Sequence, residues 1–191
     1  MLFLNRQQAA RLLAERLQHY ADQHPLVLAI PRGAVPMGRI IAEELRGDFD
    51  VVLVRKIGAP GNPEFAVGSV DESGWVYVSP YAASAGATAN YFERQKEAEL
   101  ATIRERRRRY SPQRPAHDPA GRIVIVVDDG LATGATMIAA LHGLRAKNSA
   151  KLVCAVPVAS PEAAKKSKRH RRRIHQSAYA GKFLRGGSVL P

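Results

Sequence analysis

Residues 123–136 read IVIVVDDGLATGAT, and this stretch decides the fold class of the chain. Ile123 to Val127 are five consecutive apolar residues with high β propensity, which indicates a strand buried on both faces, as in a parallel sheet. Two acids and a run of small residues follow, and we expect a helix to open near Thr136. The segment therefore predicts a loop at the carboxyl end of a buried strand, where ligands bind in open α/β sheets.

The side chains of this loop suit a sugar phosphate. Residues 133–136 (TGAT) would direct backbone N–H groups, two hydroxyls and a helix N-terminus at one anion. Asp128 and Asp129 would repel that anion, but carboxylates accept hydrogen bonds well from vicinal hydroxyls. A ribose 5-phosphate carries both kinds of group. The alternative, a plain βα turn with an acidic helix cap, leaves the two adjacent acids and the T-G-x-T run without a purpose.

The segment resembles the phosphoribosyl diphosphate signature of the type I phosphoribosyltransferases, in which an apolar strand is followed by two acids and T-G-x-T. The resemblance implies that Asp128 and Asp129 hold the ribose hydroxyls. It also implies a cradle for the 5-phosphate formed by Ala132, Thr133, Gly134, Ala135 and Thr136. Family members that act on 6-oxopurines usually carry a third acid where this chain has Ala132, so those acceptor bases are not favoured.

A second loop after an apolar strand supports this interpretation. The strand expected at Leu26 to Ile30 runs into PRGAVPMG, whose small residues allow a close approach of backbone to ligand. In the family, this loop grips the pyrophosphate of the donor, often through an unusual peptide geometry. By resemblance, the pyrophosphate loop contains Pro31, Arg32, Gly33 and Ala34.

A third predicted strand, Asp50 to Val54, ends in two cations at the same edge of the sheet. Lys56 is interpreted as a contact for the leaving pyrophosphate. For Arg55, that role and an ordinary surface charge are equally supported. The resemblance then gives Asp128, Asp129, Arg32 and Lys56 as the catalytic set.

These segments together predict an α/β protein with a Rossmann-like open, mainly parallel sheet flanked by helices. A small β-hairpin or hood insertion is expected within residues 58–90, and a helix at about 89–110. Residues 1–164 would form one phosphoribosyltransferase domain. The motifs PRG, RKIGAPGNPEFA, DDGLATGAT and VPVASPE resemble one bacterial branch of the family.

The resemblance implies a cofactor and a reaction. Family members transfer the phosphoribosyl group from phosphoribosyl diphosphate to a nitrogenous base or related nucleophile and release pyrophosphate. Mg²⁺ is the implied cofactor, held mainly by substrate and water, with Asp128 and Asp129 as its only candidate protein ligands. A donor-binding regulator without turnover is the alternative function. The acceptor base stays open.

The net charge of +12 raises a nucleic-acid hypothesis, but the charge is unevenly distributed. Residues 165–191 contain nine Lys or Arg and no acid, which leaves 20 basic against 17 acidic residues in the rest of the chain. Arg104 to Arg109 is interpreted as a solvated helix face rather than a binding patch. Neither basic run is interleaved with aromatic residues for base stacking, so nucleic acid is not expected as a partner.

Residues 165–191 also differ in composition from the rest, and we expect them to be disordered or frameshifted. As a hypothesis, the reading frame has slipped near Lys165 and Lys166, whose codons can form a run of A. Read in the shifted frame, the tail becomes acid-balanced and resembles the segment that follows VPVASPE in this branch. The nucleotide sequence of the gene tests this, because an early stop in the shifted frame would sink the hypothesis.

The remaining features predict a cytoplasmic protein. Cys154 is the only cysteine and lies in the apolar run LVCAVPVA, where it should pack as a small hydrophobe in a reducing compartment. The N-terminus, MLFLNRQQ, lacks a signal-peptide core, and no stretch approaches the roughly 18 apolar residues of a membrane span. A homodimer is left open as an assembly.

Overall fold

The computed structural model describes residues 3–111, 115–131, 134–159 and 176–179. The helices are α1 (Arg6–Leu17), a short 3-10 helix η1 (Gln18–Tyr20), α2 (Val35–Leu45), α3 (Ala89–Tyr110) and α4 (Ala135–Ala146). The strands are β1 (Leu26–Ala29), β2 (Asp48–Val51), β3 (Val54–Ala59), β4 (Asn62–Asp71), β5 (Val76–Val78), β6 (Ile123–Val127), β7 (Lys151–Val156) and β8 (Gln176–Tyr179).

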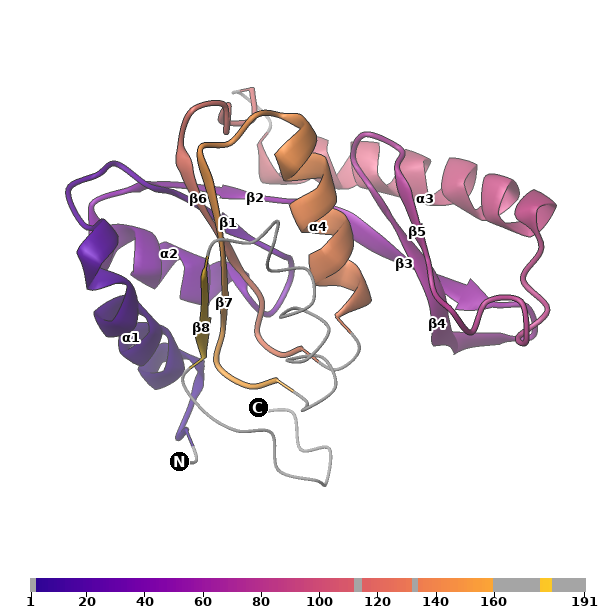
Figure 1. Cartoon of the computed structure of the whole chain (residues 1–191), viewed down its shortest axis with the longest axis horizontal. Helices are drawn as coiled ribbons and strands as arrows, with labels where there is room; N and C mark the ends of the chain where they lie inside the picture. Colours follow the sequence, from indigo (N-terminus) through magenta and orange to yellow (C-terminus); the bar gives the residue numbers. More distant parts are fainter. Residues whose placement is uncertain (1–2, 112–114, 132–133, 160–175, 180–191) are drawn as a thin grey trace.

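The described strands form two sheets. The larger has the order β2-β1-β6-β7-β8, and all its neighbours pair in parallel. The smaller has the order β3-β4-β5 and is antiparallel. Figure 1 shows the small sheet projecting to one side of the large one, with β3 leading into it. The predicted α/β class, with a mainly parallel sheet and a small β insertion, is confirmed.

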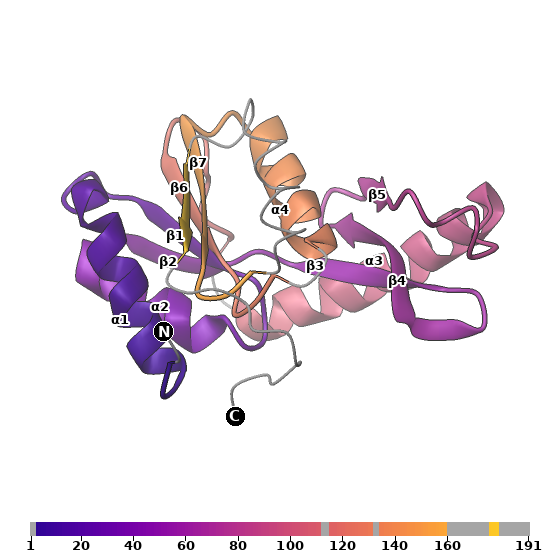
Figure 2. The ribbon, with the colours of Figure 1, turned by 60° about the horizontal axis from the view of Figure 1, so that its bottom comes forward.

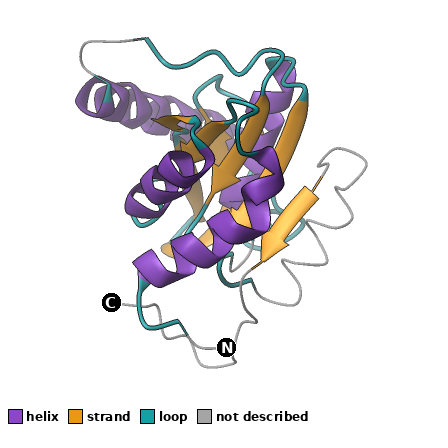
Figure 3. Ribbon diagram, turned by 90° about the vertical axis from the view of Figure 1, so that its left-hand side faces the viewer, coloured by secondary structure: helices purple, strands orange, loops and turns teal. Residues whose placement is uncertain are grey.

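Helices cover both faces of the large sheet because its central strands are apolar on both sides. In β1, Val27 and Ala29 pack in one core with α1 and α2. Leu26 and Leu28 point the other way, into a second core with α4. Figures 1 and 3 show these layers from two directions. Cys154 is fully buried in the second core, as its apolar setting predicted.

The small sheet packs against α3 around a third core, which includes Ile57, Val67, Phe92 and Ile103. Figure 2 shows α3 running beside this sheet, away from α1 and α2. The predicted helix at 89–110 is present with those bounds, and Thr88 caps it by accepting a hydrogen bond from the Tyr91 N–H.

The single strand expected at Asp50 to Val54 is wrong. The structure divides this segment between β2, which ends at Val51, and β3, which begins at Val54 and belongs to the small sheet. The physical reason is a change of pairing partner: Val51 is the last residue paired with β1, whereas Val54 is already paired with Asp71 of β4. Arg55 and Lys56 consequently lie within β3 and not in a loop after the parallel sheet.

Most of the tail assigned to residues 165–191 lies outside the described residues. Its described part, Gln176–Tyr179, forms β8 and pairs in parallel with β7, so these four residues are a strand where the sequence predicted none. Within the described parts of the chain, none of the helices has the length and apolar character that crossing a membrane requires.

Arg107 attaches α3 to the rest of the molecule. Its guanidinium donates to the Val51 carbonyl oxygen at 2.8 Å, forms an ion pair with Glu72 at 2.6 Å, and lies 3.3 Å from Asp50. Burial lowers the pKa of Arg107, but the hydrogen bonds and charges of Glu72 and Asp50 outweigh burial and raise it above the ordinary value. Asp50 is 3% exposed, so its buried carboxylate depends on Arg107 to balance its charge.

Replacing Arg107 by Gln is therefore expected to lower the free energy of unfolding by about 3 kcal/mol, because it leaves a buried carboxylate without its cation. Urea denaturation measures this difference. Arg108→Gln is the matched control, since Arg108 is exposed on the same helix and its loss should change stability by less than about 0.5 kcal/mol. Equal effects of the two substitutions would contradict the anchoring role.

Candidate active site

The register between β1 and β6 brings two loops together at the carboxyl edge of the large sheet. Ala29 is paired with Val127, and the Ile30 N–H donates to the Val127 carbonyl oxygen at 2.9 Å. The chain beyond β6 is held on its other side, because the Asp128 N–H donates to the Ala155 carbonyl oxygen of β7. The loop that starts at Pro31 therefore faces the loop that starts at Asp128, as the parallel arrangement predicts.

The two acids of the second loop have different environments. One carboxylate oxygen of Asp128 accepts the Asp129 N–H at 2.9 Å. Burial and then the charge of Asp129 together raise the pKa of Asp128 to about 7, although the hydrogen bond from the Asp129 N–H and the charge of Lys56 act in the opposite direction. Asp129 instead has a cation in contact: Arg6 Nη2 of α1 lies 3.1 Å from its Oδ2.

The turn into α4 has the conformation that an anion cradle requires. Gly134 has φ +81°, a left-handed conformation that favours glycine, and it forms the N-cap of α4. Ser69 of β4 donates to the Ala135 carbonyl oxygen at 3.0 Å, which ties this turn to the small sheet. Gly134 and Thr136 line the cavity described below. Ala132 and Thr133 lie outside the described residues.

The PRG loop is in direct contact with the loop that carries Asp128 and Asp129. The Pro31–Arg32 peptide bond is cis, which agrees with the unusual peptide geometry expected for this loop. Pro31 lines the cavity, and a Cβ at Gly33 would come within 1.8 Å of Asp129 Oδ2, so only glycine fits. Ala34 is fully buried at the start of α2. Arg32 is exposed and is not among the cavity-lining residues, and its assignment to pyrophosphate stays a prediction.

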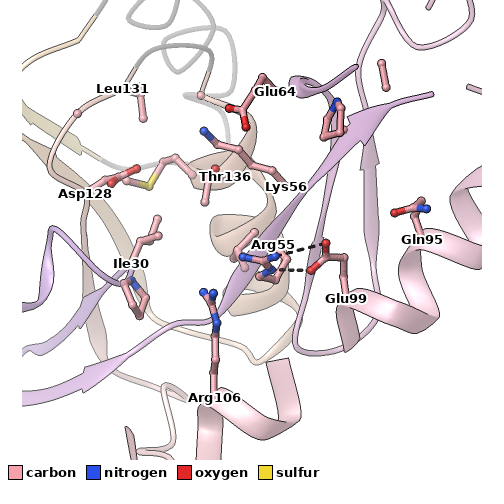
Figure 4. Close-up of a pocket in the computed structure, with 18 of the residues that line it drawn as sticks. Ile30, Arg55, Lys56, Glu64, Gln95, Glu99, Arg106, Asp128, Leu131 and Thr136 are labelled. Atoms are coloured by element: carbon pink, nitrogen blue, oxygen red, sulfur yellow. Dashed lines mark hydrogen bonds and ion pairs between the residues drawn. The ribbon is translucent and has the colours of Figure 1, made fainter. Parts of the chain in front are cut away.

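The two cations of β3 point in different directions. Figure 4 shows Lys56 reaching towards Thr136 and Asp128, while Arg55 turns towards α3. Arg55 Nε donates to Glu99 Oε2 at 2.5 Å, and its Nη2 lies 3.4 Å from Glu99 Oε1. Both cations line the cavity, and Lys56 is the one whose charge acts on Asp128.

One face of α3 forms the far wall of the cavity, and sequence reasoning missed it. Tyr91, Gln95 and Glu99 follow one another at steps of four residues, and Arg106 lies seven further on, so all four share a helix face. The Tyr91 hydroxyl donates to the Gly58 carbonyl oxygen at 2.8 Å, which joins this wall to β3. A stripe of polar residues at helical spacing was the available signal.

The arginines of the basic run at 104–109 lie in different environments, and not all of them face solvent. Arg107 lies in the anchoring cluster, and Arg109 pairs with Glu105 on the surface. Arg106 enters the cavity (Figure 4), and within the described ranges it has no hydrogen bond or ion pair. Arg104 and Arg108 are exposed, as interpreted from the sequence.

These loops and walls enclose a cavity of about 710 Å³. Its sheet edge carries Asp128, Asp129 and the α4 turn, whereas its opposite side carries Lys56 and the α3 face. The cavity can therefore accept hydrogen bonds from hydroxyls at the sheet edge, offer backbone donors to an anion at the α4 turn, and neutralise negative charge from β3.

Comparison with known proteins agrees with this geometry. The model of the phosphoribosyl transferase domain family matches residues 4–180. A provisionally named phosphoribosyl transferase of Mycobacterium tuberculosis, found in two strains, is 38% identical over 161 residues. That match covers 82% of this chain and 36% of the relative, so the chain spans about a third of the length of these proteins.

Solved structures show the same fold. The crystal structure of TT1426 from Thermus thermophilus is 42% identical with a TM-score of 0.80, covering 99% of this chain and 88% of that one. A hypoxanthine phosphoribosyltransferase from Staphylococcus aureus has a TM-score of 0.53 at 11% identity, covering 97% of this chain and 78% of that one. A purine phosphoribosyltransferase from Pyrococcus horikoshii has a TM-score of 0.53 at 12% identity, with coverages of 98% and 96%. At those low identities the likeness concerns the fold alone. Taken with the match over residues 4–180, the acid pair, the glycine turn and the facing PRG loop identify the chain as a member of the phosphoribosyl transferase domain family.

Proposed function

We propose that the chain binds phosphoribosyl diphosphate with Mg²⁺ and transfers its phosphoribosyl group to a nitrogenous base or related nucleophile, releasing pyrophosphate. The observation that carries this proposal is that one cavity combines Asp128 and Asp129 with the Gly134–Thr136 turn and the Lys56 cation. The donor has a matching order of groups: a phosphate, a diol and a pyrophosphate.

In this proposal the 5-phosphate lies at the N-terminus of α4, where backbone N–H groups and the helix dipole favour an anion. The ribose hydroxyls donate to the carboxylates of Asp128 and Asp129. The pyrophosphate extends towards Lys56 and the Pro31 loop, with Arg32 available from that loop. Arg106 adds a second cation on the side of α3.

The reaction breaks the bond between the anomeric carbon and a pyrophosphate oxygen, which keeps the electron pair. The acceptor nitrogen forms the new bond to the anomeric carbon and gives up its proton. Negative charge grows on pyrophosphate as positive charge grows on the sugar, so Lys56 stabilises the first and the acid pair the second. Holding nucleophile and anomeric carbon in line removes much of the entropic barrier.

Mg²⁺ fits the residues present. Carboxylate oxygens are the hard ligands that this ion prefers, and Asp128 and Asp129 offer them at the cavity edge. The described residues contain no group of three or more His, Cys, Asp or Glu side chains that could hold a metal ion. The ion would therefore be bound mainly through substrate oxygens and water, where it neutralises pyrophosphate.

The acceptor is left as a nitrogenous base or related nucleophile. Ala132, which replaces the acid usual in 6-oxopurine enzymes, argues against those bases, although the hypoxanthine and purine phosphoribosyltransferases named above share the fold. A donor-binding protein without turnover is the remaining alternative. Release of pyrophosphate with any of a panel of bases separates that alternative from the enzyme.

Isothermal titration of the chain with phosphoribosyl diphosphate and Mg²⁺ is expected to show saturable binding, and the Asp128→Asn/Asp129→Asn double variant is expected to lose it. The physical reason is that the variant replaces both hydroxyl-accepting carboxylates with amides. Circular dichroism verifies that both proteins are folded. A folded wild-type chain that does not bind the donor would overturn the proposal.

A second expectation concerns pH and the ligand-free protein. Because the folded-state pKa of Asp128 is raised to about 7, the folded protein retains a proton that the unfolded chain releases near pH 4. Stability of the wild type should therefore fall as pH rises from about 4 to 7, and Asp128→Asn should remove that loss. We expect the variant to be more stable than the wild type by about 2 kcal/mol at pH 8 and equally stable at pH 4. The gain at pH 8 is smaller than the full pKa shift implies, because the Asp128 side chain is partly exposed.

Chemical denaturation at the two pH values, without Mg²⁺ or donor, measures this difference. The matched control is Glu97→Gln, an exposed carboxyl of α3, which should show no pH-dependent gain. A gain of the same size at pH 4 and pH 8 would show that the amide stabilises for another reason.

A further inference from the structure

The first helix contributes a side chain that contacts one of the residues lining the cavity. Arg6 Nη2 donates to Asp129 Oδ2 at 3.1 Å, across a sequence separation of 123 residues. The two side chains are 28% and 30% exposed, so the pair is partly shielded from solvent. A charged hydrogen bond in such a setting is stronger than a surface ion pair.

Local sequence fixes the position of Arg6. Asn5 caps α1 by accepting the Gln8 N–H, at 2.9 Å, which makes Arg6 the first helical residue. The fully buried Ala9, Ala10 and Leu13 hold the helix in the core beneath the large sheet. The start of α1 is therefore oriented by packing before any ligand arrives.

The contact restrains Asp129 from one side while the PRG loop restrains it from another. Gly33 lies so close that even a Cβ there would overlap Asp129 Oδ2. The same carboxylate lines the cavity. One acid of the signature is thus clamped between α1 and the PRG loop, and its negative charge is balanced by a residue outside the signature.

Building on the proposed function, we propose that Arg6 is a positioning residue of the donor site: it fixes the orientation of the Asp129 carboxylate for the ribose hydroxyls. Arg6 acts through Asp129 and does not itself bind the pyrophosphate. A purely structural contact, which only keeps α1 attached, is the competing explanation. The positioning role and the structural contact predict different sets of ligands whose binding weakens when the guanidinium is removed.

The test uses the whole chain with Mg²⁺ and two titrants, phosphoribosyl diphosphate and inorganic pyrophosphate. Arg6→Gln should weaken binding of the first about tenfold, because a charged hydrogen bond that orients the diol acceptor is lost. Binding of pyrophosphate, which has no ribose, should stay within about twofold of the wild type. Arg6→Lys should fall between, since it keeps the charge but not the fork geometry.

Two further variants complete the design. Arg11→Gln, an exposed arginine of α1, is the matched control and should bind both titrants like the wild type. In an Asp129→Asn background, Arg6→Gln should cause no further loss, because its effect passes through Asp129. Thermal unfolding verifies that each variant is folded at the titration temperature.

Equal weakening of both titrants by Arg6→Gln would overturn the inference and indicate a structural contact. Losses that add in the double variant would also overturn it, because Arg6 would then act independently of Asp129. Absence of donor binding by the folded wild type would overturn the proposed function and this inference with it. If the wild type binds the donor, a failure of the Arg6→Gln expectations overturns only this inference.

Discussion

The register between β1 and β6 is the constraint on which the cavity depends. Each residue from Leu26 to Ala29 is paired with one from Val124 to Val127, and the Ile30 N–H extends the ladder by one bond. Shifting one strand by a residue would turn its side chains into the opposite core and separate the PRG loop from the acid pair. Because both faces of these strands are apolar and buried, such a shift is strongly disfavoured, and the two loops meet without any direct attraction between ligand-binding side chains.

The opposite wall of the cavity is built by long-range polar contacts instead of by strand pairing in the large sheet. Arg107 joins α3 to the end of β2 and to the small sheet, and the same helix presents the Tyr91 to Arg106 face to the cavity. The third hydrophobic core orients α3 against the small sheet. The ion pairs of Arg107 with Asp50 and Glu72 connect α3 to the parallel sheet. The cavity therefore has one wall fixed by backbone hydrogen bonds and another fixed by a hydrophobic core together with side-chain charge.

This difference explains what the sequence could and could not predict. The apolar run at 123–127 and the T-G-x-T turn are local signals, and they were enough for the parallel sheet, the α4 turn and the acid pair. The division of one predicted strand after Val51 depends on a change of partner strand from β1 to β4, and pairing is a tertiary property. The Arg6 contact spans 123 residues and leaves no local pattern at all. The α3 face did leave a polar stripe, but a solvated surface produces the same stripe.

Charge in the cavity is divided between its two sides, and this division limits what can bind. Asp128 and Asp129 lie at the sheet edge, while Lys56 and Arg106 lie opposite, and Arg55 is already paired with Glu99. A ligand that is anionic throughout would be repelled by the acids, and a neutral one would leave Lys56 and Arg106 without a counter-charge. A ligand with hydroxyls at one end of its ring and a polyanion at the other satisfies both sides. Among the described residues, Arg6 forms an ion pair with Asp129, whereas Asp128 has none and is affected by the more distant charge of Lys56. The ion pair at Asp129 reduces the repulsion within the acid pair and still leaves carboxylate oxygens to accept from a diol.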